Sequence, residues 1–382
     1  VRTDEQEPDE TARIALEGIR EEIALRRESF SSAGMIVRLT TFGESHGPAV
    51  GAVLDGIQPG VEISTDEIQV ELDRRRPGQS KMTTSRSEAD QVQILSGVFE
   101  GRTTGHPIAL LIANRDHDSS KYDALREVFR PGHADFTFWK KYGLRDHRGG
   151  GRSSGRETAA RVAGGAIAKQ ILAERGVEII AHTVRIGEVF AATFDAEAIE
   201  RNPVRCADPE AAPAMEKLVL QAREDNDSIG GAVEVVVRGC PAGLGDPIFG
   251  RLDARLGHAL FSLGAVKGVE VGVGFRAAQM HGSEFNDPMR DGEFVTNNAG
   301  GVLGGISNGA DIVLRAAVKP TPSIAQPQQT VDKTGSNVDI TIEGRHDPCI
   351  VPRIVPVMES MAALVLLDTW ELQKRLRPDG TV

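Results

Sequence analysis

The chain has 382 residues, of which 40% are hydrophobic and 26% are charged, and its formal net charge is −11. At about 150 residues per domain, this length predicts two or three domains. The negative balance argues against wholesale nucleic-acid binding, because a phosphate backbone requires a basic face. No apolar run approaches the roughly 20 residues that cross a bilayer, and no secretory signal is visible. We therefore expect a globular cytoplasmic protein that does not bind membranes.

Cysteine use gives no sign of a disulfide framework or a metal site. The three cysteines, Cys206, Cys240 and Cys349, are far apart and show no paired C-x-x-C spacing. We expect them to be reduced and structural, and we expect no bound metal.

The first 34 residues differ in character from the rest of the chain. Residues 11–30 place Ile14, Ile19 and Ile23 on one stripe of an amphipathic helix, after a strongly acidic start. We expect residues 1–34 to form an acidic helical extension and residues 35–382 to form the catalytic domain.

Residues 36–42 alternate like a strand and lead directly into a turn that contains His46 between glycines. Thr65 is placed to cap a helix from Asp66 to about Arg75, which Pro77 and Gly78 end. Residues 92–98 and 107–112 read as strands among glycines. This pattern favours a hairpin-rich antiparallel sheet over alternating βαβ units.

The helix over 66–75 leads into a basic run, Arg74 to Lys81, and donors continue through Arg86. Cations at a helix C-terminus compensate its dipole, which explains one or two of these charges. The whole cluster is better suited to a phosphate or a carboxylate.

A second histidine, His133, follows a rigid Pro-Gly turn. Either histidine alone can be a structural residue in a turn. Together, with unperturbed pKa values near 6.5, they can exchange protons at neutral pH as general acids.

The segment Arg145 to Thr158 holds three consecutive glycines, 149–151, and four arginines at positions 145, 148, 152 and 156. Bare backbone amides beside Arg and Ser donors form a concave site for an anion. Residues 157–172 read as an Ala-rich helix, so the glycines precede a helix N-terminus that favours negative charge. A flexible surface loop is the alternative, but it does not account for such crowding of positive charge.

The second half alternates strands and helices without a nucleotide-binding signature. Strands are predicted near 178–190, 232–237 and 338–343, and helices over 252–263 and 356–367. The glycines of 268–275 open no helix, so they are not a dinucleotide fingerprint. The glycine-rich stretch 297–309 suits either backbone contact with a flat ligand or a run of tight turns. The succession Arg345-His346-Asp347 suits either a structural ion pair or a site.

Seven segments together resemble the chorismate synthase family, and they occur in the family's order between Met35 and about Leu367. They are Gly43–Gly47, Arg74–Ser80, Arg130–Asp135, Gly149–Thr158, Gly300–Ser307, Lys319–Ser323 and Arg345–Cys349.

The resemblance implies an α+β fold, a single large domain in which a helix layer lies between antiparallel sheets, assembled as a homotetramer. It implies a lyase of the shikimate pathway that converts 5-enolpyruvylshikimate 3-phosphate to chorismate by anti 1,4-elimination. It also implies dependence on reduced FMN, with NADPH as a possible reductant.

The resemblance also assigns roles to residues. His46 is similar to the histidine that protonates the departing phosphate, His133 to the one near the reduced flavin, and Asp347 to the aspartate that assists proton transfer at flavin N5. The expected FMN contacts are Arg152, Ser153, Ser154, Gly264, Ala265, Gly304, Lys319, Pro320, Thr321, Pro322, Ser323 and Arg345. The expected contacts to substrate or NADPH are Arg75, Lys81, Arg130 and Arg156.

Two positions depart from the family pattern. Lys81 stands where Arg is frequent, which replaces a bidentate donor with a point charge, and Gly264 stands where Asn or Pro is common. Two other classes of protein would also use these arginines. A phosphoryl-transfer enzyme should show a Walker lysine or a carboxylate pair for magnesium, and neither is clearly placed. A nucleic-acid-binding module should lose affinity steeply with salt and ignore flavin.

Overall fold

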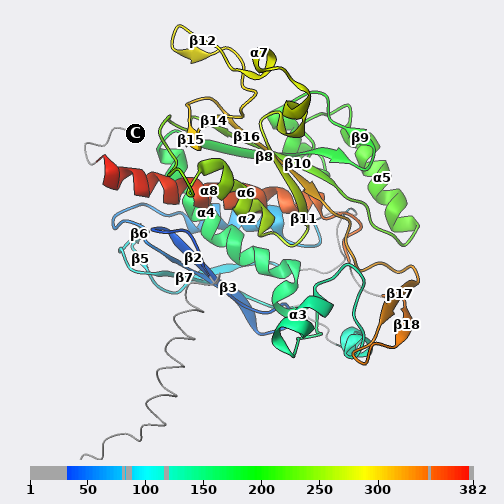
Figure 1. Ribbon diagram of the computed structural model, residues 1–382. Helices are drawn as coiled ribbons and strands as arrows, with labels where there is room; N and C mark the ends of the chain where they lie inside the picture. The colour runs from blue at the N-terminus through cyan, green and yellow to red at the C-terminus, as the bar shows by residue number, and fades with distance from the viewer. Residues whose placement is uncertain (1–31, 80–81, 83–87, 116–119, 343–345, 378–382) are drawn as a thin grey trace, which may run out of the picture.

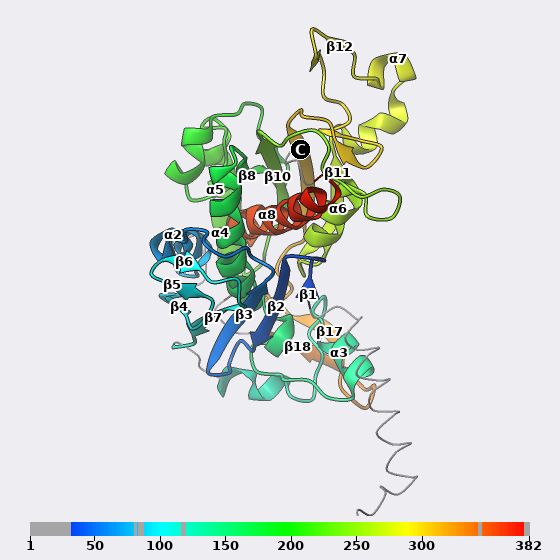
Figure 2. The same cartoon turned by 90° about the vertical axis from the view of Figure 1, so that its left-hand side faces the viewer.

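The computed structural model describes residues 32–79, 82, 88–115, 120–342 and 346–377. Two antiparallel sheets enclose a layer of helices, which Figure 1 shows as α2, α4 and α8 between the lower and the upper sheet. The view turned by 90° shows the same three layers (Figure 2). The α+β fold expected from the resemblance is confirmed.

The first sheet contains the strand that leads to His46. Within the described residues it has five strands in the order β1-β2-β3-β7-β4, and all the pairs are antiparallel. Its strands are β1 (Ser32–Ala33), β2 (Arg38–Gly43), β3 (Ala49–Asp55), β7 (Ile108–Ala113) and β4 (Val92–Ile94). The predicted antiparallel, hairpin-rich arrangement of this region is therefore confirmed.

The second sheet covers the other side of the helices. Its order is β11-β16-β10-β8-β9 within the described residues, again antiparallel throughout. Its strands are β11 (Val266–Val271), β16 (Ile312–Val318), β10 (Gly231–Arg238), β8 (Glu178–Ile186) and β9 (Val189–Phe190). Alternate residues of β16, from Ile312 to Val318, are buried against the helices, as a strand with one covered face requires.

Four helices form or flank the middle layer: α2 (Thr65–Arg75), α4 (Thr158–Glu174), α6 (Leu252–Phe261) and α8 (Val351–Leu376). The small residues of α4 allow close packing, since a Cβ on Gly165 would lie 2.3 Å from Cβ of Ser360 on α8. A Cβ on Gly164 would lie 2.4 Å from Cδ1 of Leu39 on β2. The predicted helix over 157–172 is α4, and its Ala and Gly content fits it for burial between layers.

Two helix ends differ from the sequence predictions. The side chain of Ser64, one residue earlier than the expected Thr65, caps α2 by accepting from the N–H of Glu67 at 3.2 Å. The last helix begins at Val351, before the predicted position 356. Pro352 lies in its first turn, where a backbone N–H would have no intrahelical partner, so a proline is tolerated there.

The remaining elements lie around these layers. They are the helices α3 (Asp135–Tyr142), α5 (Ala212–Glu224) and α7 (Gly282–Phe285) and the hairpins β5 (Val98–Phe99) with β6 (Arg102–Thr103), β12 (Met289–Arg290) with β13 (Glu293–Phe294), β14 (Val302–Leu303) with β15 (Ile306–Ser307), and β17 (Gln328–Val331) with β18 (Asn337–Ile340). Short 3₁₀ turns cover Ser120–Leu125, Gly151–Ser153, Gly155–Glu157, Ala196–Arg201 and Gly274–Gln279.

The N-terminal side of the domain is anchored to the last helix. The backbone N–H groups of Met35, Ile36 and Val37 all donate to the carboxylate of Asp368 on α8. Ser32 and Ala33 pair with β2 and therefore belong to the first sheet, although both precede the domain boundary expected after residue 34. The helix predicted over 11–30 lies outside the described residues.

The three cysteines are buried free thiols, as expected. Burial raises the pKa of Cys349 to about 12 and that of Cys240 to about 11, so both remain protonated at neutral pH. Among the residues in the described ranges, no helix is long and apolar enough to cross a membrane.

Candidate active site

The triple-glycine loop brings the two predicted histidines together. Gly149, Gly150 and Gly151 have positive φ angles of 62°, 86° and 52°, a region that other residues rarely adopt. A Cβ on Gly149 would lie 2.4 Å from Cδ2 of His46, and a Cβ on Gly150 would lie 2.9 Å from Cε1 of His133. Only glycines allow the loop backbone to approach both rings this closely.

His46 is held in the turn between β2 and β3, and it is 8% exposed. Asn114, which follows β7, donates from Nδ2 to the carbonyl oxygens of Glu44 and Gly47 at 2.9 and 2.7 Å. The ring of Tyr122 meets the His46 ring edge-on, with centroids 5.0 Å apart. Asn114 therefore fixes the backbone around His46 from a neighbouring strand.

His133 belongs to a buried charged cluster. Arg130 donates to both carboxylate oxygens of Asp135, from Nε at 2.7 Å and from Nη2 at 3.0 Å. Nδ1 of His133 lies 3.0 Å from Oδ1 of Asp135, and Nη1 of Arg145 lies 3.2 Å from the same oxygen. Burial opposes ionisation of Asp135, but the hydrogen bonds from Arg130 and His133 outweigh it and hold its pKa well below its ordinary value. Burial, reinforced by Arg130, lowers the pKa of His133.

A second pair of arginines shares another aspartate. Arg75, the last residue of α2, and Arg156 are 2% and 4% exposed, and both contact Asp90. Nε of Arg156 donates to Oδ1 of Asn114 at 2.9 Å, while its Nη2 is buried with no hydrogen-bond partner among the described residues. Burial, together with the nearby charge of Arg353, lowers the pKa of Arg75 to about 9, so its guanidinium is still protonated at neutral pH.

The expected FMN contacts at 152–154 make hydrogen bonds inside the protein. Arg152 donates to the carbonyl of Gly43 at 2.8 Å and to the hydroxyl of Thr41 at 2.7 Å, and its side chain is 34% exposed. The Ser153 hydroxyl donates to the carbonyl of Gly150 at 2.7 Å, and Ser154 Oγ accepts from the N–H of Arg156 at 3.3 Å. These residues brace the loop against the end of β2.

The segment 319–323 reaches the same region from the second sheet. The N–H of Lys319 donates to the carbonyl of Ala265 at 2.9 Å, and its Nζ donates to the carbonyl of Gly132 at 3.1 Å. A Cβ on Gly132 would lie 3.3 Å from Cβ of Pro322. The hydroxyl of Thr321 is buried with no partner among the described residues. Ala265, Lys319 and Pro322 are thus gathered next to the His133 loop.

Gly304, another expected FMN contact, does not lie with the expected contacts near the two histidines. It is an exposed residue with a φ of 61° in the turn between β14 and β15, and its Cβ position has no neighbour within 4 Å. Figure 1 places β14 and β15 at the upper end of the molecule, whereas α3 and β17 lie at the lower end. Within one chain, Gly304 stands apart from the two histidines.

The 345–347 motif is described only in part. Asp347 pairs with the guanidinium of Arg353 on α8, and Nε of Arg353 lies 3.3 Å from the carbonyl of Arg75, to which it donates. His346 has a buried Nε2 with no partner among the described residues, and burial, with Arg130 nearby, lowers its pKa to about 4. The expected contacts Lys81 and Arg345 lie outside the described residues.

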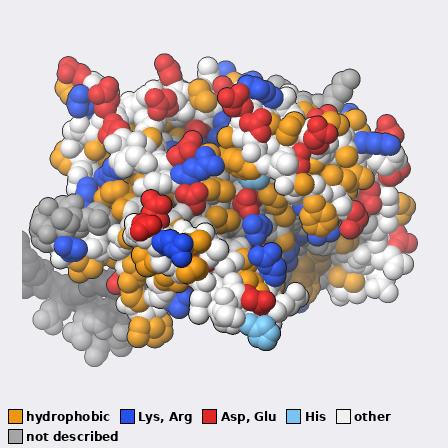
Figure 3. Space-filling view, turned by 90° about the horizontal axis from the view of Figure 1, so that it is seen from above, with side chains coloured by type: hydrophobic (Ala, Val, Ile, Leu, Met, Phe, Trp, Pro, Cys, Tyr) orange, Lys and Arg blue, Asp and Glu red, His pale blue; other side chains and the backbone are white. Residues whose placement is uncertain are grey.

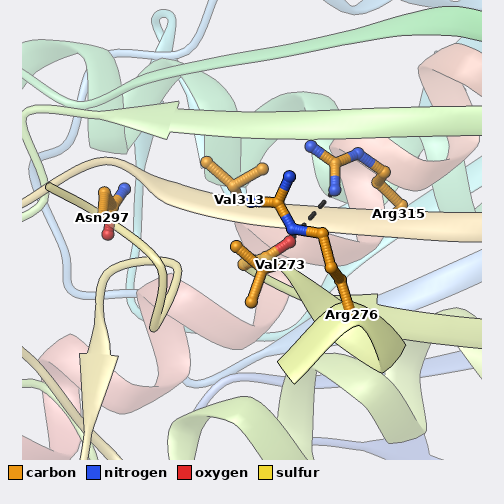
Figure 4. A pocket seen from close by; sticks show the side chains of 6 residues that line it. Val273, Arg276, Asn297, Val313 and Arg315 are labelled. Atoms are coloured by element: carbon orange, nitrogen blue, oxygen red, sulfur yellow. Dashed lines mark hydrogen bonds between the residues drawn. The ribbon is translucent and has the colours of Figure 1, made fainter. Parts of the chain in front are cut away.

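A cavity of about 320 Å³ lies away from the predicted site residues. It is lined by Gly272, Val273, Arg276, Asn297, Val313 and Arg315. Figure 4 shows Arg276 and Arg315 close together beside it, with a hydrogen bond of 3.0 Å from Arg315 to the carbonyl of Gly272. None of the predicted site residues lines this cavity. No group of side chains suited to a metal ion occurs in the described part of the chain.

Comparison with known proteins shows which family the chain belongs to. The family model of chorismate synthase matches residues 37–370. A chorismate synthase of Syntrophobacter fumaroxidans is 59% identical over 338 residues, which are 88% of this chain and 96% of that protein. One of Methanosarcina mazei is 58% identical over 344 residues, covering 88% and 94%. A crystal structure of chorismate synthase superposes with a TM-score of 0.72 at 34% identity, covering 89% of this chain and 93% of that chain.

The chain belongs to the chorismate synthase family. Membership makes it a flavin-dependent lyase that acts on a small-molecule substrate. The departure at Gly264 is sterically mild, because the Cβ position of Gly264 has no neighbour within 4 Å and its φ is not in the left-handed region.

Three residues of the candidate site had no assigned role in the sequence prediction: Asp90, Asn114 and Asp135. Each holds a predicted residue in place, and each lies on a different segment of the chain. Asp135 lies within the quoted motif 130–135, so its closeness to His133 was visible there. Asn114 is a polar residue directly after the apolar strand β7, which is a weak signal. Nothing in the sequence linked Asp90 to Arg75 or Arg156.

Proposed function

We propose that the chain forms chorismate where His46 and His133 meet the triple-glycine loop. The family's reaction converts 5-enolpyruvylshikimate 3-phosphate to chorismate and inorganic phosphate, the last common step toward the aromatic amino acids. The observation that carries the proposal is that two histidines from different segments lie against one glycine loop, beside two aspartates that are each paired with two arginines.

The excess positive charge matches the substrate. Arg75 and Arg156 share Asp90, and Arg130 and Arg145 share Asp135, so each of these buried aspartates forms ion pairs with two arginines. Buried charge of one sign is costly unless an opposite charge relieves it. The substrate brings one phosphate and two carboxylates, groups that guanidinium side chains bind by paired hydrogen bonds.

The net reaction breaks the bond between C3 and the phosphate oxygen, whose electron pair leaves with the phosphate, and releases the C6 hydrogen as a proton, so that a second ring double bond forms. His46 donates a proton to the departing phosphate. Its buried turn, fixed by Asn114, keeps the imidazole in one place beside the loop. A positioned general acid of this kind accelerates a reaction by about 10²- to 10⁴-fold.

Reduced FMN is the proposed cofactor; when bound, it would supply transient electron donation to a reaction that is redox-neutral overall. The residues present fit a phosphate-bearing, hydrogen-bonding ligand. The buried hydroxyl of Thr321 lacks a partner among the described residues, and the recorded contact of Nζ of Lys319 is to a carbonyl. Together with Ala265 and residues 152–154, these side chains would hold the flavin beside His133.

Assembly as a homotetramer is also part of the proposal. Figure 3 views the molecule from above the second sheet and shows apolar side chains interspersed with charged ones. Large exposed apolar side chains lie on the segments at this end, namely Ile248, Phe249, Phe275, Met289, Val295 and Leu303. Exposed apolar surface of this kind is typical of contacts between subunits.

An anaerobic assay tests the function. The protein is mixed with 5-enolpyruvylshikimate 3-phosphate and chemically reduced FMN, and chorismate and phosphate are measured. We expect both products in equal amounts, and no product with oxidised FMN alone. Absence of chorismate with reduced FMN would contradict the proposal. A parallel reaction with NADPH and oxidised FMN shows whether the chain reduces its own flavin.

A further inference from the structure

Asp135 lies directly behind His133, as the first residue of α3, and its side chain is 2% exposed. Besides the two hydrogen bonds from the Arg130 side chain, Oδ2 accepts from the backbone N–H of Arg130 at 3.1 Å. Arg145 approaches Oδ1 from another segment at 3.2 Å. With both oxygens engaged in this way, the carboxylate has a single orientation relative to the imidazole.

The two neighbours of His133 Nδ1 determine which ring nitrogen carries the proton. Nδ1 lies 3.0 Å from Oδ1 of Asp135 and 3.1 Å from Nη2 of Arg130. A carboxylate only accepts hydrogen bonds, and a guanidinium only donates them. A proton on Nδ1 is donated to Asp135, whereas a bare Nδ1 would turn its lone pair toward an anionic oxygen at 3.0 Å. One N–H of Nη2 of Arg130 donates to Oδ1 at 3.0 Å, and the anionic oxygen is a stronger acceptor for both Nη2 and Nδ1 than a neutral ring nitrogen is.

We propose that Asp135 is a positioning residue that holds His133 as the neutral Nδ1–H tautomer and thereby presents Nε2 to the glycine loop as a proton acceptor. The opposite edge of the ring faces that loop, since a Cβ on Gly150 would lie 2.9 Å from Cε1 and 3.1 Å from Nε2 of His133. A ring nitrogen at this edge is available to a ligand in the site.

The charges around the ring keep it neutral. Arg130, Lys319 and His346 all face His133, and Asp135 is the one carboxylate among the described residues that contacts it. Because Arg130 and Arg145 already neutralise Asp135, little negative charge remains to favour the imidazolium. Burial acts in the same direction and lowers the pKa of His133 below its ordinary value of 6.5.

Nuclear magnetic resonance of the wild-type chain tests the tautomer without turnover. Histidine is labelled with ¹⁵N, long-range ¹H–¹⁵N correlations are recorded at pH 7, and the variant His133→Gln identifies the signal of His133. We expect a neutral ring protonated at Nδ1. A ring protonated at Nε2, or at both nitrogens, would overturn the proposal.

The variant Asp135→Asn tests the consequence for the reaction. Its amide can donate to Nδ1, so we expect the proton to move to Nε2 and the single-turnover rate to fall about 10²-fold. The control is Asp208→Asn, because Asp208 is also buried and accepts from backbone N–H groups at 192 and 193. It should leave the tautomer and the rate unchanged. An unchanged tautomer and rate in Asp135→Asn would overturn the positioning role.

The catalytic part of this inference rests on the proposed function, but the tautomer does not. If His133 is protonated at Nδ1 and yet His133→Gln turns over normally, the proposed role of His133 fails while the tautomer stands. If His133→Gln is inactive and the wild-type ring is protonated at Nε2, the positioning role of Asp135 fails while the proposed function stands. The wild-type spectrum decides between these outcomes even where Asp135→Asn does not fold.

Discussion

Arg74 and Arg75 are neighbours at the end of α2, yet the charged groups around them differ: Arg74 contacts three carboxylates, whereas Arg75 shares one carboxylate with a second arginine. Arg74 contacts Glu71, Glu200 and Glu359 at 2.7, 2.8 and 2.6 Å. Arg75 turns to the other side of the helix and shares Asp90 with Arg156. Burial acts against the charge of both, but Glu359 raises the pKa of Arg74, whereas Arg353 adds to burial and lowers that of Arg75 to about 9.

The difference separates a structural ion network from a ligand site. In the network, three cations (Arg74, Lys169, Arg205) face three carboxylates (Glu71, Glu200, Glu359). In the site, the recorded ion pairs of four arginines (75, 130, 145, 156) are to two carboxylates, those of Asp90 and Asp135. A balanced network is complete in the folded chain. We propose that an anionic ligand completes the unbalanced one.

The largest effect is expected from His46→Ala, which changes the candidate site. Turnover should fall by about 10²- to 10⁴-fold, because the departing phosphate loses its proton donor, while FMN affinity stays close to normal. Steady-state rates and a flavin titration measure the two quantities. His106→Ala is the control, since His106 is exposed and its recorded hydrogen bond is to Thr104. Loss of flavin binding in His46→Ala would make this histidine structural.

In the ion network of Arg74 and Lys169, Glu359→Gln should chiefly reduce the free energy of unfolding. It leaves Arg74 and Lys169 without their shared buried carboxylate, a change that costs about 3–5 kcal/mol of unfolding free energy. Denaturant unfolding measures this loss, and the rate per folded molecule should be retained. Glu197→Gln, in an exposed pair with Arg201, should change stability by less than about 1 kcal/mol.

The same carboxylate predicts a pH dependence. Burial raises the pKa of Glu359, but Lys169 and Arg74 outweigh burial and lower it from 4.5 to about 2. A depressed folded-state pKa means that the stabilisation is fully present above about pH 4.5 and is lost as the pH falls toward about 2. This loss should be absent in Glu359→Gln. Equal acid sensitivity of the two proteins would contradict the assignment.

Asp347 lies in the candidate site but forms a one-to-one ion pair with Arg353, so its substitution tests whether such a pair is catalytic or structural. If Asp347 has the proposed catalytic role, Asp347→Asn should slow the single-turnover rate about 10²-fold, with substrate and FMN binding retained. Rapid-mixing measurements under anaerobic conditions separate binding from chemistry. A normal single-turnover rate with reduced stability would place Asp347 on the structural side of the comparison.

The smallest effect is expected from removing residues 1–31, which precede every matched motif and leave β1 and the Asp368 contacts in place. Turnover should stay within about tenfold of the full chain. A larger loss would mean that this segment packs on the site or between subunits.

The sequence anticipated which segments form the site better than how they are held. The glycines at 149–151 and the two histidines were recognisable because positive φ and proton transfer each require particular residue types. The partners Asp90 and Asn114 were not, because their roles depend on which strands the fold places side by side. The basic cluster at 74–81 also gave no sign that Arg74 and Arg75 separate, since that follows from their different faces of α2.

The proposed function requires that the unbalanced arginines bind the anionic substrate. Calorimetric titration of 5-enolpyruvylshikimate 3-phosphate into Arg74→Met and Arg75→Met, with oxidised FMN present to prevent turnover, tests it directly. Charge-assisted hydrogen bonds contribute about 1.5–3 kcal/mol, so Arg75→Met should weaken binding by roughly tenfold or more. Arg74→Met should bind like the wild type in its folded fraction. Equal affinities of the two variants, or weaker binding by Arg74→Met, would contradict the claim.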